Sequence, residues 1–244
     1  MKSLPVFFHL AFFLLCLTNL YAEWADSILL IYGSKPLLIT SLAAYFYWST
    51  VQYSIPFRHL IFLGLLFSVG GDTILMFVEN DAQYAHCFVY GLGSFLITHL
   101  FYGYAFVKWP KQDKGLLSKF PWLMALLLLF FLGNSVFLWP DLPEHLQIPV
   151  VVYSAIILSM TTACIHLYGC IPNISFQLLL AGVLLFVLSD SIIALNKFKG
   201  DQFLIPYVRL IIMLTYLAGQ YLIVRGAVSL LKSQGQAIEY NDVF

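Results

Sequence analysis

The sequence predicts an all-α membrane protein, a bundle of about eight transmembrane helices. Of the 244 residues, 61% are hydrophobic and only 10% are charged, whereas a soluble domain carries about 25% charged residues. The apolar residues run in blocks of roughly twenty, the length a helix needs to cross a ~30 Å hydrocarbon core. The blocks lack the alternation of a membrane β-strand, and a helix satisfies its own backbone hydrogen bonds in lipid.

The connections between these blocks are short and rich in Pro, Gly and charge, as in residues 109–115 and 139–143. No connection is long enough to separate two domains, so we expect one domain over residues 1–244. From the N-terminus onward the predicted spans are 4–22, 27–48, 57–78, 85–107, 120–138, 146–168, 174–195 and 204–231.

The first span has a second interpretation. Lys2 followed by an apolar stretch up to Ala22 is also typical of a cleaved signal peptide. The residue three positions before that cut is Leu20, which is bulkier than the small residue usual there, so a retained helix is favoured. Cleavage would leave seven spans and the same topology for the rest.

Lys and Arg are divided unequally between the two predicted faces of the membrane. One face carries eight of them and the other only Lys197 and Lys199. Cytoplasmic loops carry an excess of basic residues, so both termini are predicted to be cytoplasmic, at the inner membrane if the chain is bacterial. The eight basic residues are Lys2, Arg58, Lys108, Lys111, Lys114, Lys119, Arg225 and Lys232.

Composition also limits the partners and cofactors. The net charge is zero, which gives no indication of a nucleic-acid partner. The four cysteines form no CxxC motif and no His/Cys cluster with metal-ligand spacing. We therefore expect membrane lipids as partners, no disulfide framework, no metal and no cofactor, while the oligomeric state is not readable.

Once the basic residues assigned to the two faces are set aside, four charged side chains remain inside the spans: Lys35, Asp72, Asp190 and Arg209. Such residues cost about 2.5–3.5 kcal/mol near the bilayer centre and usually face the bundle interior with a partner or a task. At 1.5 Å per residue, all four lie roughly 7–12 Å from the outer boundary. They are either structural ion pairs, Asp72 with Lys35 and Asp190 with Arg209, or parts of a functional site.

The two aspartates have similar sequence surroundings. Each has a Gly eight residues earlier, at Gly64 and Gly182, a Leu six residues earlier and an Ile two residues later. This similarity suggests two four-helix repeats related by an axis along the membrane normal, which would bring both carboxylates to a central cavity.

Other polar residues in the spans are candidates for the same cavity. Tyr153 lies level with the aspartates, Asn196 caps the seventh span, and Ser94 is within reach of the layer. His99 and Tyr216 lie deeper. Together with Lys35 and Arg209, these residues are the predicted substrate-binding set.

The chain resembles the YhhN-type lysoplasmalogenases, small eight-helix membrane proteins. The resemblance covers roughly residues 30–225 and departs from the expected pattern at Gly219, where an alanine usually stands. It rests on the segments 35–37 (KPL), 71–72 (GD), 91–102 (GLGSFLITHLFY) and 185–191 (LFVLSDS), with Asn196, Phe198, Tyr216 and Gln220.

The resemblance implies hydrolysis of the vinyl-ether bond of a lysophospholipid, releasing a fatty aldehyde and glycerophosphocholine or glycerophosphoethanolamine. Such a reaction suits one protonated and one ionised carboxyl, as in glycosidases. Asp72 and Asp190 are the expected dyad, although their individual roles cannot be assigned. Lys35 or Arg209 would bind the phosphate or bias the dyad.

Two other functions remain open from the sequence. Intramembrane Asp, Lys and Arg are also used by proton-coupled transporters, although here the charges cluster near one face. A noncatalytic lipid-binding subunit is the third interpretation. An ester lipase is not indicated, because the sequence has no GxSxG motif.

Overall fold

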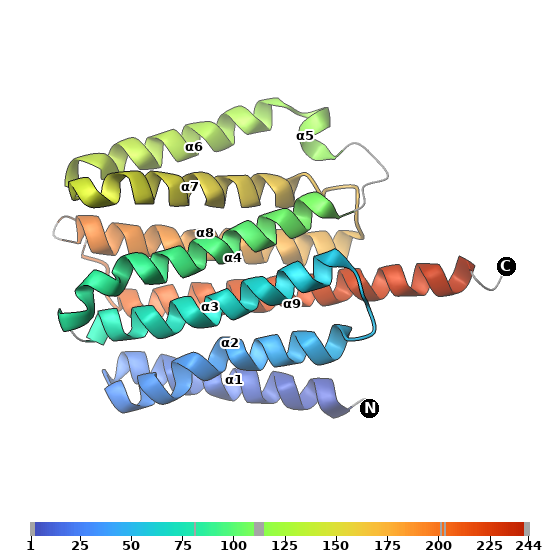
Figure 1. Cartoon of the computed structure of the whole chain (residues 1–244), viewed down its shortest axis with the longest axis horizontal. Coiled ribbons are helices and arrows are strands. Elements are labelled where there is room, and N and C mark those ends of the chain that lie inside the picture. The colour runs from blue at the N-terminus through green and yellow to red at the C-terminus, as the bar shows by residue number, and fades with distance from the viewer. Residues whose placement is uncertain (1–2, 81, 110–114, 201, 203, 242–244) are drawn as a thin grey trace.

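A computed structural model describes residues 3–80, 82–109, 115–200, 202 and 204–241. The described chain is almost entirely helical, and the long helices lie side by side as one bundle (Figure 1). Its elements are α1 (Ser3–Trp24), α2 (Ile28–Thr50), α3 (Pro56–Asn80), η1 (Ala82–Cys87), α4 (Phe88–Lys108), α5 (Leu116–Lys119), α6 (Trp122–Leu138), η2 (Trp139–Asp141), α7 (Glu144–Ile165), α8 (Asn173–Lys199) and α9 (Val208–Asn241).

The predicted helical membrane fold is confirmed. Seven helices of the described chain are long and apolar enough to cross a membrane, namely α1, α2, α3, α6, α7, α8 and α9. The remaining predicted span corresponds to α4, which has 21 residues but is made less apolar by its histidine, tyrosines and glycines. Helix α4 runs beside α3 (Figure 1), and its buried polar residues Thr98, His99 and Tyr102 face other helices.

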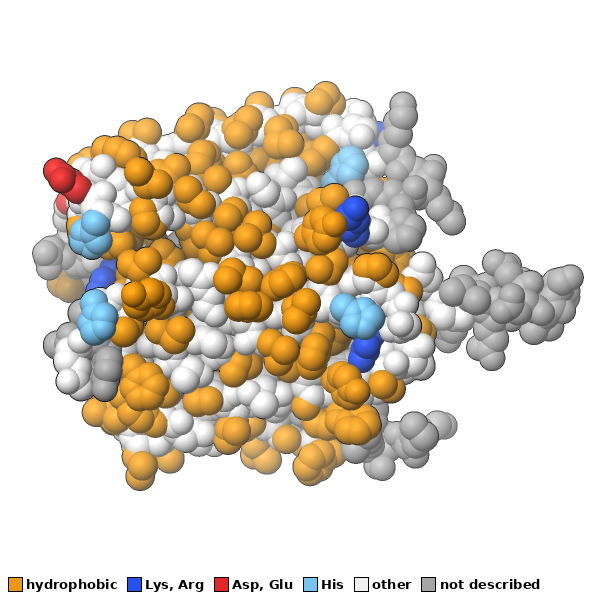
Figure 2. Space-filling view, in the orientation of Figure 1, with side chains coloured by type: hydrophobic (Ala, Val, Ile, Leu, Met, Phe, Trp, Pro, Cys, Tyr) orange, Lys and Arg blue, Asp and Glu red, His pale blue; other side chains and the backbone are white. Residues whose placement is uncertain are grey.

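The bundle has an apolar outer surface between two polar ends (Figure 2). Large hydrophobic side chains such as Leu29, Leu129 and Val136 are exposed, as expected of residues that face lipid tails. Helix α6 is the most exposed span and α9 the most buried. The beginning of α1 and the end of α9 lie at one end of the bundle (Figure 1), and we call the opposite end the distal end.

Glycines set the closest helix contacts. A Cβ atom added at Gly182 of α8 would lie 2.7 Å from the carbonyl oxygen of Gly219 in α9. The two helices therefore meet backbone to backbone, which only residues without a side chain permit. In α3, Gly64 lies against the ring of Tyr102 and Gly71 against that of Phe95. These contacts fix α3 on α4 and α8 on α9.

The arrangement of neighbouring helices supports the suggested repeat, which stays a prediction. Helix α1 packs on α2, α3 on α4, and α2 on α9; correspondingly α6 packs on α7, α8 on α9, and α7 on α4. Tyr102 and Gln220 are 118 positions apart and share a hydrogen bond of 2.9 Å. The same separation relates Asp72 to Asp190. A direct bond between equivalent positions is what two residues on a pseudo-twofold axis would form.

Helix α1 is an integral part of the packing. Phe12 is buried and stacks on Tyr221 of α9, with ring centroids 5.5 Å apart. Asn19 donates a hydrogen bond of 3.0 Å to Ser34 of α2. These contacts join α1 to α2 and α9, and the retention of the first span stays a prediction.

Candidate active site

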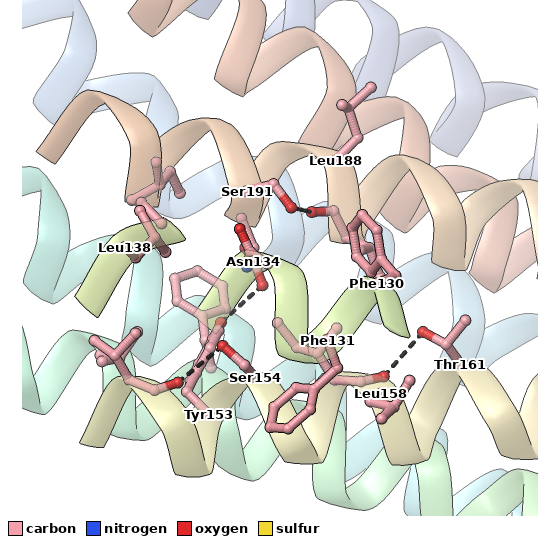
Figure 3. A pocket seen from close by; sticks show the side chains of 18 of the residues that line it. Phe130, Phe131, Asn134, Leu138, Tyr153, Ser154, Leu158, Thr161, Leu188 and Ser191 are labelled. Atoms are coloured by element: carbon pink, nitrogen blue, oxygen red, sulfur yellow. Dashed lines mark hydrogen bonds between the residues drawn. The ribbon is translucent and has the colours of Figure 1, made fainter. Parts of the chain in front are cut away.

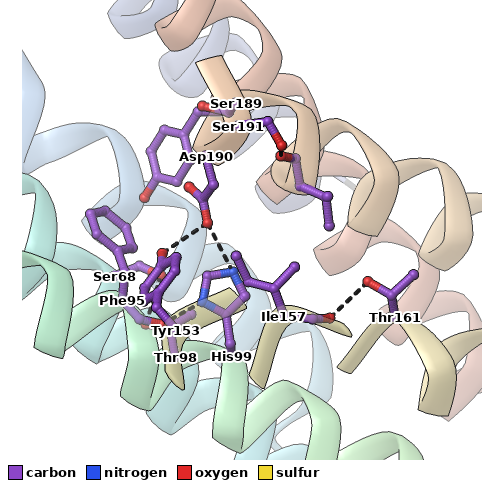
Figure 4. A network of polar contacts seen from close by, with 12 residues as sticks. Ser68, Phe95, Thr98, His99, Tyr153, Ile157, Thr161, Ser189, Asp190 and Ser191 are labelled. Atoms are coloured by element: carbon purple, nitrogen blue, oxygen red, sulfur yellow. Dashed lines mark hydrogen bonds and ion pairs between the residues drawn. The ribbon is translucent and has the colours of Figure 1, made fainter. Parts of the chain in front are cut away.

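Asp190 of α8 is held by side chains from two other helices (Figure 4). The hydroxyl of Tyr153 in α7 donates a hydrogen bond of 2.8 Å to its Oδ2 atom. The same oxygen lies 3.4 Å from Nε2 of His99 in α4. His99 is fully buried, and 9% of the Asp190 side chain is exposed. Two of the predicted substrate-binding residues are thus brought to one of the predicted catalytic carboxyls.

A backbone contact indicates how the His99 ring is protonated. Its Nδ1 atom lies 2.6 Å from the carbonyl oxygen of Phe95. Since a carbonyl can only accept, Nδ1 carries a hydrogen, and the neutral ring presents a lone pair at Nε2. A lone pair facing a carboxylate oxygen is repulsive unless a proton lies between them. This geometry favours a proton on the carboxyl of Asp190, in addition to the hydrogen on Nδ1 of His99.

Asp190 also lines a cavity of about 490 Å³. The walls come from α3, α4, α6, α7 and α8, and most of the lining side chains are aliphatic or aromatic (Figure 3). Among the described residues that line it, Asp190 is the sole acidic side chain. The polar lining residues are Asn134, Tyr153, Ser154, Thr161, Asp190 and Ser191.

The cavity is elongated along the helix axes. On α7 its lining extends from Val150 to Thr161, which at 1.5 Å per residue is about 17 Å. One leaflet of a ~30 Å hydrocarbon core is about 15 Å thick. The cavity therefore has the length and apolar lining to hold one lipid chain, with a carboxyl in its wall.

Asp72 of α3 belongs to a neighbouring polar network. The hydroxyl of Tyr216 in α9 donates a hydrogen bond of 2.8 Å to its Oδ2 atom. Gln220, one turn further along α9, donates to Ser68 at 2.9 Å and accepts from Tyr102 at 2.9 Å. Asp72 is buried and is not among the residues that line the 490 Å³ cavity. Of the two predicted carboxyls, only Asp190 therefore lies in the cavity wall.

Aromatic rings connect the two networks. The ring of Phe186 lies 4.6 Å from that of His99 and 5.3 Å from that of Tyr216, centroid to centroid. The ring of Phe95 also contacts Tyr216, at 5.7 Å. Asp190 thus bonds to Tyr153 of α7 and Asp72 to Tyr216 of α9. The rings of Phe95 and Phe186 form an aromatic layer between the two networks.

Lys35 and Arg209 both form ion pairs with Glu23, a residue that the sequence analysis assigned to the outer face. Glu23, in the last turn of α1, lies 3.8 Å from the Lys35 ammonium and 3.0 Å from the Arg209 guanidinium. Arg209 also pairs with Asp26 at 3.2 Å. This cluster joins α1, α2 and α9. Neither cation lines the cavity, so their predicted contact with substrate stays a prediction.

Two other predicted residues lie apart from the cavity lining. Ser94 donates a hydrogen bond of 2.6 Å to the carbonyl of Phe67, which fastens α4 to α3. Asn196 is exposed near the end of α8. The sequence analysis did not predict the hydrogen bond between Gln220 and Ser68. An amide side chain inside an apolar span is nevertheless a signal of a partner on another helix.

The sequence is similar to known membrane proteins. The sequence profile of the YhhN family matches residues 30–227. The chain belongs to the YhhN family. It is 37% identical over 177 residues to the protein named lysoplasmalogenase TMEM86A of Bos taurus, covering 71% of this chain and 67% of that protein.

More distant relatives carry the same name. The chain is 35% identical to lysoplasmalogenase TMEM86A of Homo sapiens, over 71% of this chain and 67% of that protein. It is 30% identical to the lysoplasmalogenase of Mycobacterium bovis, over 69% of this chain and 60% of that protein. No solved structure matches the chain. With the apolar helices, these relatives show an integral, multi-pass membrane protein.

Proposed function

We propose that this protein is a lysoplasmalogenase, which hydrolyses the vinyl-ether bond of a 1-alkenyl lysophospholipid to a fatty aldehyde and a glycerophospho-base. The observation that carries the proposal is the carboxyl of Asp190, which lies in the wall of an apolar cavity of lipid-chain length and contacts His99 at 3.4 Å. The relatives named lysoplasmalogenase support it.

The chemistry begins with a proton. The Asp190 carboxyl delivers its proton to the β-carbon of the vinyl ether, whose π electrons form the new C–H bond. The ether oxygen shares a lone pair with the α-carbon, which gives an oxocarbenium ion. The ionised Asp190 stabilises this cation, as carboxylates do in glycosidases.

Water completes the reaction. Asp190 accepts a proton from a water molecule as the water oxygen attacks the α-carbon, which restores the protonated carboxyl and gives a hemiacetal. The hemiacetal hydroxyl then gives up its proton as the carbon–oxygen bond to the glycerol breaks, the glycerol oxygen takes a proton in its place, and the aldehyde is released. The sum is one vinyl ether and one water giving one aldehyde and one alcohol.

Asp72 is the second carboxyl of the proposed dyad. Its burial and its bond from Tyr216 suit a fixed negative charge behind the aromatic layer, where it would favour the cationic transition state. The two aspartates would then have unequal roles, with Asp190 at the reacting carbons.

We also propose that both termini are cytoplasmic. Arg58, Lys108, Lys119, Arg225 and Lys232 belong to the end of the bundle that carries the termini. Apart from the intramembrane residues Lys35 and Arg209, the described basic residues of the distal end are Lys197 and Lys199. Lys2, Lys111 and Lys114 lie outside the described residues. In a bacterium the protein would lie in the inner membrane, because the spanning proteins of that membrane are helical. Accessibility of single introduced cysteines to a membrane-impermeant reagent tests it.

Two matched lipids test the proposed activity. The purified protein is given a 1-alkenyl lysophosphoethanolamine or its saturated 1-alkyl-ether analogue, and aldehyde is measured. We expect aldehyde from the alkenyl lipid alone, because only a vinyl ether can be protonated on carbon. Folded protein that releases no aldehyde from ethanolamine or choline lipids would refute the proposal, and proton flux in proteoliposomes would then favour the transporter.

A further inference from the structure

Lys197, near the end of α8, lies beside the cavity. Its ammonium lies 5.2 Å from the ring centroid of Phe88, a residue that lines the cavity. The Phe88 ring in turn contacts that of Phe198, another lining residue, at 6.4 Å. The positive charge is thus positioned at the distal end of the same cavity that contains Asp190.

The other cations of the distal end are already neutralised. Lys199 forms an ion pair with Asp141, and Lys35 and Arg209 share Glu23. Lys197, by contrast, forms no ion pair with any side chain that the structure describes. An exposed cation with no acidic partner among the described side chains, beside an apolar cavity, is suited to receive an anion.

The position of Lys197 relative to Asp190 has a defined length. The two residues are seven positions apart, nearly two full turns, and so lie on the same face of α8. At 1.5 Å per residue this separation is about 10.5 Å. It runs along the cavity, toward the membrane surface at the distal end.

The substrate of the proposed reaction has a matching length. Seven covalent bonds separate the β-carbon of the vinyl ether from the phosphorus of the head group. An extended chain covers about 3.3–3.6 Å for every three bonds, which gives about 8 Å for seven. A hydrogen bond from an ammonium to a phosphate oxygen adds about 2.8 Å. The sum, about 11 Å, agrees with the spacing on α8.

We propose that Lys197 forms the phosphate subsite of the lysophospholipid, with the vinyl ether at Asp190 and the alkenyl chain in the apolar cavity beyond it. The inference rests on the proposed function for the identity of the lipid. It assigns the head group to the membrane surface and the chain to the bilayer interior, the orientation a lysophospholipid already has in the leaflet at the distal end.

Binding of nonhydrolysable lipids tests the subsite without turnover. The probes are a saturated 1-alkyl-ether lysophosphoethanolamine and the 1-alkylglycerol that lacks the phosphate. For Lys197→Ala we expect about a tenfold weaker Kd for the phosphorylated lipid and an unchanged Kd for the alkylglycerol. Lys197→Arg should restore the affinity, because it keeps the positive charge. In the control Lys199→Gln, any loss should be equal for the two lipids.

Two results would overturn the subsite. One is an unchanged Kd of Lys197→Ala for the phosphorylated lipid, as expected if the lysine is merely solvated. The other is a phosphate-selective loss in Arg209→Gln but not in Lys197→Ala, which would place the phosphate at the Glu23 cluster. Aldehyde release is measured separately: selective binding at Lys197 without aldehyde would keep the subsite and refute the hydrolase.

Discussion

Replacement of Asp190 by Asn removes the transferable proton and keeps the shape of the side chain. The amide can still donate a hydrogen bond to Nε2 of His99 and interact with the hydroxyl of Tyr153, the two groups that contact Oδ2 in the native protein. Neither buried partner is therefore left without a hydrogen bond, and the variant is expected to fold. What it loses is the acid that protonates carbon.

The size of the loss follows from general acid–base catalysis. A positioned acid or base contributes about 10²–10⁴-fold in rate, or roughly 3–5 kcal/mol at 1.36 kcal/mol per factor of ten. We expect kcat of Asp190→Asn to fall by at least about a hundredfold, with KM nearly unchanged because the apolar cavity is intact. Aldehyde release is measured on detergent-solubilised protein, and thermal unfolding reports whether the variant is folded.

A neighbouring residue provides the control. Ser191 lines the same cavity but directs its hydroxyl to the Val187 carbonyl of its own helix, at 2.8 Å. Ser191→Ala should keep kcat within about threefold of the native value, since no hydrogen bond to another helix is lost. A folded Asp190→Asn protein that keeps more than a tenth of the native kcat would refute the role assigned to this carboxyl.

Three further changes test the site and its supports. Tyr153→Phe removes the hydrogen-bond donor to the Asp190 carboxyl. Because a hydrogen bond to a charged group contributes about 1.5–3 kcal/mol, kcat should fall about tenfold or more. A pH–rate profile that shifts while Tm stays constant would distinguish this effect from misfolding. Glu23→Gln removes a buried carboxylate from its ion pairs with Lys35 and Arg209 and should lower the free energy of unfolding by about 3–5 kcal/mol, seen as a lower Tm; an unchanged Tm would contradict it. Gly182→Ala drives a Cβ into the α9 backbone and should destabilise the bundle by about 1–3 kcal/mol, whereas Gly33→Ala, with open space around it, should not.

The sequence predicts the bundle well because membrane spans are set by local composition. Apolar runs of about twenty residues satisfy the bilayer on their own, so the helices follow the predicted spans closely. The largest extension is at the last span, predicted as 204–231 and found as Val208–Asn241. Its final turns are polar and continue beyond the apolar stretch, which hydropathy does not register.

The partners of the intramembrane charges were harder to predict. Depth placed Lys35, Asp72, Asp190 and Arg209 in one layer. It did not show that Lys35 and Arg209 share Glu23, because Glu23 follows the apolar run of α1 and was interpreted as a loop residue. Depth also says nothing about rotation around a helix axis. The bond from Tyr153 to Asp190 and the position of Lys197 both depend on that rotation, and only packing determines it.

The most direct test of the account is the site of proton transfer. The reaction is run in D₂O with a 1-alkenyl lysophospholipid, and the aldehyde is reduced as it forms so that later exchange is prevented. Protonation of the β-carbon predicts one deuterium at C2 of the product, and none from the Asp190→Asn protein above background. Aldehyde without deuterium at C2, or equal labelled product from both proteins, would contradict the mechanism.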